Sequence, residues 1–85
     1  MAENASVIYG VVRDSGGRPV PGARVYFMSG PVALPDIAAL TGADGAFALT
    51  APASGSYEVG CATDDDSTSV TVEVSGRDAQ IEIRL

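Results

Sequence analysis

Three consecutive aspartates are the one group of side chains in this sequence with the composition of a metal site. Asp64, Asp65 and Asp66 lie in a turn between two alternating apolar stretches. Calcium takes about six to eight oxygen ligands, and carboxylates clustered in a loop supply some of them. These three do not follow the spaced ligand order of an EF-hand loop, and alternating side chains cannot all face one ion. We therefore expect a solvated turn, with a weak calcium site as the alternative.

Cys61 is the only cysteine, and the sequence contains neither histidine nor lysine. Catalytic triads and Cys–His pairs need imidazole, and one thiol cannot hold zinc. Cys61 alternates with Tyr57 and Val59, which predicts an inward-facing structural thiol rather than a reactive thiolate. We expect no catalytic residues, no cofactor and no internal disulfide.

The charge balance limits the partners. The formal charge is −6, from 11 acidic residues against 5 arginines. Nucleic acids require a basic patch, so this acidic chain is not expected to bind them. No apolar stretch is long enough to cross a membrane, and no signal peptide is visible. The expected location is the cytoplasm, or a particle whose components are exported without a cleaved signal.

The spacing of turn-forming residues predicts the fold class. Ten glycines and five prolines interrupt the chain about every 8–12 residues, as in β-sandwiches and barrels. Alternating apolar residues predict about seven antiparallel strands in one domain, residues 1–85. The stretch from Gly10 to Val25 is interpreted as a strand, a tight polar reversal and the next strand, and residues 42–45 as a hairpin turn.

The segment from Ser29 to Thr41 is apolar but contains Pro31 and Pro35, which exclude a central strand. Its second half fits one helical turn or a loose edge strand. The whole segment either packs over one end of the sandwich or forms a binding loop.

Two strands have large side chains on both faces. Val7, Tyr9 and Val11 alternate with the core residues of the first strand, and Tyr26 and Met28 do so in the second. Exposed apolar patches on small domains mark interfaces. These five residues are the predicted protein interface.

The chain resembles the carboxypeptidase regulatory-like domain family in three ordered motifs. They are Ile8-x-Gly10-x-Val12-x-Asp14 with Gly17-x-Pro19-Val20-Pro21-Gly22-Ala23-x-Val25, then Thr41-x-x-Asp44-Gly45-x-Phe47-x-Leu49, then Gly55-x-Tyr57-x-Val59. The chain departs from the family pattern at Gly42, where Asp is common, and in its long segment 29–41. The resemblance implies a transthyretin-like (prealbumin-like) Greek-key β-sandwich that serves as an accessory, spacer or assembly module and not as an enzyme.

Two functions follow from these observations. The first is a non-enzymatic module that docks on or decorates a larger multi-subunit assembly through its apolar sheet face. The second is an accessory module that binds glycan or weakly held calcium through loops 29–41 and 64–67. The absence of tryptophan counts against glycan binding.

Overall fold

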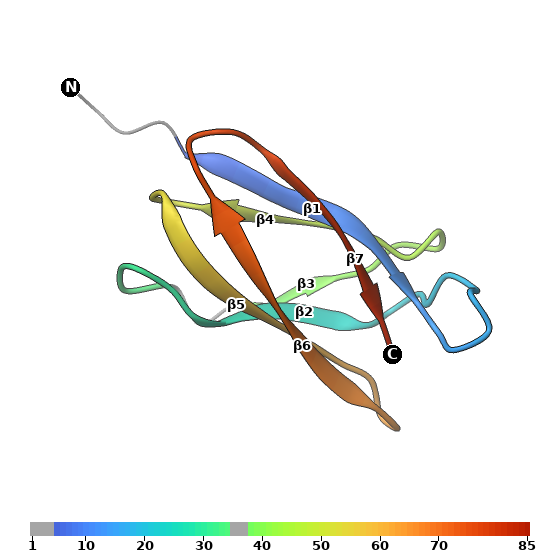
Figure 1. Cartoon of the computed structure of the whole chain (residues 1–85). Coiled ribbons are helices and arrows are strands. Elements are labelled where there is room, and N and C mark those ends of the chain that lie inside the picture. The colour runs from blue at the N-terminus through green and yellow to red at the C-terminus, as the bar shows by residue number, and fades with distance from the viewer. Residues whose placement is uncertain (1–4, 35–37) are drawn as a thin grey trace.

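The computed structural model describes residues 5–34 and 38–85, which contain strands and no helix. The strands are β1 (Ser6–Arg13), β2 (Arg24–Ser29), β3 (Ala38–Leu40), β4 (Ala46–Ala51), β5 (Gly55–Ala62), β6 (Ser67–Val74) and β7 (Ala79–Arg84). They form a three-stranded sheet in the order β4-β1-β7 and a four-stranded sheet in the order β3-β2-β5-β6 (Figure 1). The predicted all-β sandwich of about seven strands is confirmed.

Alternation along the strands explains why the core lies between the two sheets. In β4 every second residue is buried, and in β5 Tyr57, Val59 and Cys61 are fully buried. Successive side chains of a strand point to opposite faces, so each sheet contributes one apolar face to the core. The largest fully buried side chains are Tyr57, Ile8, Ile83, Val12, Val25, Val59 and Cys61.

One strand pairing differs from the expected antiparallel arrangement. β1 pairs with β4 antiparallel, but its other neighbour, β7, runs parallel to it. Gly10 lies opposite Ile81 in this parallel pair, and a Cβ atom on Gly10 would be 1.7 Å from the carbonyl oxygen of Ile81. The glycine in the middle of β1 therefore allows the backbone of β7 to come close, which no larger residue permits.

The tight reversal after β1 and the predicted hairpin turn at residues 42–45 both carry the chain from one sheet to the other. The corner after β1 makes a single bridge, Arg13 to Pro19, and then delivers β2 to the four-stranded sheet. The turn at Gly42–Gly45 closes with a 2.9 Å hydrogen bond from the Gly45 N–H to the Gly42 carbonyl, but it joins β3 to β4 in the opposite sheet. The tight turn at residues 42–45 was predicted correctly. The prediction that it joins two strands of one hairpin was wrong, because β3 and β4 lie in different sheets.

In the described part of the segment between β2 and β4, residues 30–34 pack over one end of the sandwich and residues 38–40 form an edge strand. A Cβ atom on Gly55 would be 2.8 Å from Pro31, and one on Gly30 would be 2.8 Å from Leu34 and 2.9 Å from the Tyr57 ring. Leu34 packs against the core, and Ala38–Leu40 pairs with β2 as an edge strand. Residues 35–37, which include Pro35, lie outside the described residues.

Candidate protein-docking surface

The outward face of the three-stranded sheet carries an apolar strip. Val7, Tyr9 and Val11 point away from the core on β1; Tyr9 is 41% exposed and the two valines are half-buried. In the antiparallel register Tyr9 lies beside Ala48 and Val11 beside Ala46, both exposed on β4. We call these five residues the β1 face. It is two strands wide, and the aromatic ring lies near its centre.

Charged and polar residues border the β1 face on the β7 side. In the parallel register Tyr9 lies beside Gln80 and Val11 beside Glu82. The Glu82 carboxylate accepts a hydrogen bond from Arg13 Nε at 2.9 Å and one from Arg84 at 3.3 Å. The Arg13 guanidinium also donates to the Gly17 carbonyl at 3.0 Å. An apolar centre with a polar rim is the composition of protein–protein interfaces.

The structure does not bring the five predicted interface residues together. Tyr26 and Met28 lie on β2, in the four-stranded sheet, and also point away from the core. The outward faces of two packed sheets lie on opposite sides of the molecule (Figure 1). The prediction that these five residues form a single interface was therefore wrong, because the corner between β1 and β2 crosses from one sheet to the other.

Tyr26 has a role within the fold. It lies opposite Gly60 on β5, and a Cβ atom on Gly60 would be 2.5 Å from the Tyr26 ring. The ring therefore covers the bare backbone of Gly60, which is buried although it faces outward. Packing over Gly60 therefore accounts for the large outward-facing side chain of Tyr26, and no partner protein is needed to explain it.

Met28 and Leu40 are the most exposed large apolar side chains on the four-stranded sheet. Met28 lies where the β2–β5 register shifts between Phe27 and Ser29, and it is 56% exposed. Leu40 is 68% exposed on the edge strand β3, opposite Arg24. The sequence does not reveal that Leu40 is an exposed apolar residue, because the 3 residues of β3 are too few to show an alternation of inward and outward side chains.

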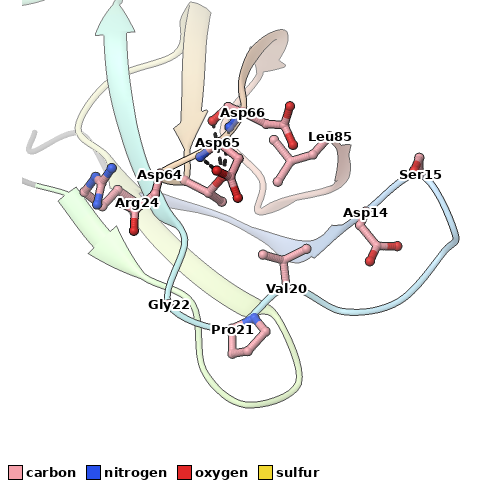
Figure 2. A pocket seen from close by; sticks show the side chains of 11 residues that line it. Asp14, Ser15, Val20, Pro21, Gly22, Arg24, Asp64, Asp65, Asp66 and Leu85 are labelled. Carbon is pink, nitrogen blue, oxygen red and sulfur yellow. Dashed lines mark hydrogen bonds between the residues drawn. The ribbon is translucent and has the colours of Figure 1, made fainter.

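The three aspartates lie on the rim of an open groove of about 440 Å³. Figure 2 shows them on one side, Asp14 and Ser15 of the β1–β2 corner on another, and Val20 and Leu85 between. Thr63 organises the turn: its hydroxyl oxygen accepts hydrogen bonds from the N–H groups of Asp65 and Asp66, at 3.3 and 3.1 Å.

No group of acidic or thiol side chains in the described residues is arranged to hold a metal ion. The fourth aspartate of the groove, Asp14, uses one carboxylate oxygen to accept hydrogen bonds from the N–H groups of Gly16 and Arg18, at 2.9 and 3.0 Å. The groove therefore consists of two self-contained turns facing each other.

The two loops proposed for ligand binding lie at opposite ends of the four-stranded sheet. Residues 30–34 follow the end of β2 that pairs with Glu58, whereas residues 63–66 follow the other end of β5, beside Arg24. Residues 30–34 therefore do not form one site with the aspartate turn. At the other end of loop 29–41, Thr41 contacts the β1–β2 corner through its hydrogen bond with Ala23.

Cys61 is fully buried between the sheets, as predicted. Burial raises the pKa of the Cys61 thiol above its ordinary value of 9.0, because the thiolate would be desolvated. This thiol is a core residue with little thiolate character.

The first two family motifs form one hydrogen-bonded network around the corner. The Thr41 hydroxyl is buried; it accepts from the Ala23 N–H at 2.8 Å and donates to the Val20 carbonyl at 2.6 Å. Gly45 has φ +77, and its carbonyl accepts from the Val12 N–H at 2.9 Å. The motif that contains Val12 and Val20 thus meets the motif that contains Thr41 and Gly45, and their hydrogen bonds join the two sheets.

A family model for the carboxypeptidase regulatory-like domain matches residues 7–85. The chain belongs to this family. No curated protein sequence matches the chain significantly. Carboxypeptidase regulatory-like domains are non-catalytic β-sandwich modules, and the two-sheet arrangement described above is that of the family.

No helix in the described part of this regulatory-like domain is long and apolar enough to cross a membrane.

Proposed function

We propose that this domain is a non-enzymatic docking module that attaches to a larger protein assembly through the β1 face. The observation that carries the proposal is the apolar strip of Val7, Tyr9 and Val11 beside Ala46 and Ala48. These side chains point away from the core, so folding of the sandwich does not require them to be apolar.

The geometry of the β1 face suits a protein partner. The strip lies on two neighbouring strands of a three-stranded hydrogen-bonded sheet, whose ladder holds the backbone in place, so little conformational entropy is lost on binding. Tyr9 supplies an aromatic side chain near the centre, the position at which interface residues contribute most energy. The ion pairs of Glu82 with Arg13 and Arg84 border the strip without entering it.

The non-enzymatic part of the proposal rests on the family and on the composition. The family is non-catalytic. The chain has no histidine or lysine to act as a general base, and its one thiol is buried with a raised pKa.

The proposal is tested by comparing matched substitutions on the two outward faces. Tyr9→Ser removes the aromatic side chain of the β1 face, and Met28→Ser makes a comparable apolar-to-polar change on the opposite face. Partners are recovered with the tagged domain from its native cell, identified by mass spectrometry, and their affinities measured with purified components. Tyr9→Ser is expected to weaken binding by about tenfold or more, whereas Met28→Ser leaves it unchanged.

Both variants must show the circular dichroism spectrum of the wild type, because a fold defect would lower binding at any surface. Equal affinity of wild type and a Tyr9→Ser/Val11→Ser variant would overturn the proposal. Loss of binding in Met28→Ser alone would move the docking surface to the four-stranded sheet.

A further inference from the structure

Asp44 is the only aspartate of the chain that is followed by glycine. The backbone nitrogen of a residue after aspartate can attack the carboxyl carbon of that aspartate, and glycine has no side chain to block the approach. A bond then forms between the Gly45 nitrogen and Asp44 Cγ. The hydroxyl of the protonated carboxyl group leaves with the Gly45 N–H proton as water, and a cyclic succinimide remains. Water opens this ring at either carbonyl and yields aspartate or isoaspartate, so solvent is the only co-reactant.

In the closed turn both reacting groups of this pair are engaged elsewhere. The Gly45 N–H donates to the Gly42 carbonyl at 2.9 Å, which holds the proton that the attack must remove. Asp44 Oδ1 accepts a hydrogen bond from the Ala46 N–H at 3.1 Å, so the carboxylate is held by the amide beyond the one that would attack it. Asp44 is exposed, and water therefore reaches the carboxylate in the folded protein.

The backbone of Gly45 is also fixed by the corner beneath it. Gly45 is buried and has φ +77, and its carbonyl accepts a hydrogen bond from the Val12 N–H at 2.9 Å. A Cβ atom on Gly45 would be 2.7 Å from the Val12 carbonyl oxygen and 3.1 Å from Pro19. The peptide group between Asp44 and Gly45 must rotate before its nitrogen can attack, and this packing prevents the rotation while the turn is closed.

We propose that Asp44 is the residue at which this chain isomerises to isoaspartate, and that the closed turn at residues 42–45 gates the reaction. The reaction proceeds from the open turn, so its rate in the folded protein is the rate in the unfolded chain multiplied by the fraction of open turn. Isomerisation is much slower than the opening and closing of a turn, and it therefore reports the equilibrium population of the open form.

The product does not fit the closed turn. Isoaspartate carries the main chain through the side-chain methylene group and so lengthens the backbone between Asp44 and Gly45 by one carbon atom. The hydrogen bond from the Val12 N–H to the Gly45 carbonyl and that from the Gly42 N–H to the Ala46 carbonyl, at 3.1 Å, lie on either side of the added atom. Each modification therefore weakens the connection between β4 and the β1–β2 corner. The reaction depends on this turn and not on the proposed docking function.

The first test uses Asp44→Asn as a reporter. The amide side chain keeps an oxygen that accepts from the Ala46 N–H, and asparagine before glycine suits a tight turn. Attack by the same nitrogen now releases ammonia, and hydrolysis of the ring leaves a carboxyl group, so mass spectrometry of peptides follows the conversion. At neutral pH the folded variant should convert at least about tenfold more slowly than the same variant in urea, because the turn must first break its hydrogen bonds. Equal rates in the two conditions would overturn the proposal.

The second test compares isomerisation of the wild type with hydrogen exchange. The Gly45 amide should be protected from exchange by the same factor by which folding slows isoaspartate formation at Asp44. Thr41→Val, which weakens the corner, should speed both reactions by one common factor, whereas Thr50→Val on the exposed face of β4 should change neither. Faster exchange without faster isomerisation would overturn the gating. Isoaspartate that forms first at another aspartate of the chain in urea would overturn the assignment to Asp44.

Discussion

Tyr57 both packs in the core and forms hydrogen bonds with the turn between β4 and β5. Its side chain is fully buried, and its ring lies 5.1 Å from that of Phe27 between centroids. Its hydroxyl donates to the Ala53 carbonyl at 2.6 Å and accepts from the Ala53 N–H at 3.1 Å. The alternation of Tyr57 with Val59 and Cys61 predicts the inward ring. One side chain thus fills the core and fixes the β4–β5 turn.

We expect Tyr57→Phe to lower the free energy of unfolding by about 1–3 kcal/mol, because both backbone groups of Ala53 lose their partner while the ring remains. Urea denaturation measures the change. Tyr9→Phe is the matched control, since its hydroxyl belongs to an exposed ring, and it should unfold like the wild type. A Tyr57→Phe variant as stable as Tyr9→Phe would show that water replaces the hydroxyl at no cost.

At the scale of elements, short polar motifs connect strands that do not pair with each other. The chain passes between sheets after β1 and again after β3, so strand pairing cannot stabilise these two connections. Thr41 joins them instead: its N–H donates to the Ala23 carbonyl at 2.9 Å, and its carbonyl accepts from the Gly22 N–H at 3.0 Å. With the hydroxyl bonds, one residue ties the start of β2 to the connection between β3 and β4.

Thr41→Val retains the shape of the side chain and removes the hydroxyl. The buried Ala23 N–H then lacks an acceptor, so we expect a loss of about 1–3 kcal/mol in unfolding free energy and faster amide exchange at Ala23. Thr50→Val on the exposed face of β4 is the control, and it should leave both quantities unchanged. Unaltered exchange at Ala23 in Thr41→Val would contradict the role given to this network.

At the scale of the whole molecule, the acidic charge acts against compactness. The formal charge of −6 resides on an 85-residue chain, and the three aspartates of the β5–β6 turn are adjacent and exposed. Like charges gathered on a compact surface repel one another, and salt screens that repulsion. The Thr63 hydroxyl oxygen accepts the two hydrogen bonds that shape this turn.

We expect added sodium chloride to raise the melting temperature by about 2–6 °C, and calcium chloride at equal ionic strength to raise it by the same amount. Replacing Asp64, Asp65 and Asp66 with asparagine should reduce the salt response. An additional stabilisation by calcium that disappears in the asparagine variant would instead demonstrate a specific calcium site, because a ligand that binds only the folded state stabilises it.

The sequence by itself determined the strands, the inward faces, the buried thiol and the family, because alternation and turn chemistry are local properties of the chain. It did not determine which strands pair. The parallel β1–β7 pair, the crossing of the Gly10–Val25 corner between sheets and the separation of Tyr9 from Tyr26 depend on contacts between distant segments.

Only the tertiary structure decided which outward side chains form a surface. Tyr26 and Tyr9 have the same sequence pattern, yet one covers Gly60 and the other stands among Val11, Ala46 and Ala48. Strand register decides this difference, since it assigns each outward residue its neighbours on the adjacent strand. The composition of the β1 face thus follows from pairing across the sheet, and alternation along β1 alone predicts only that its residues point outward.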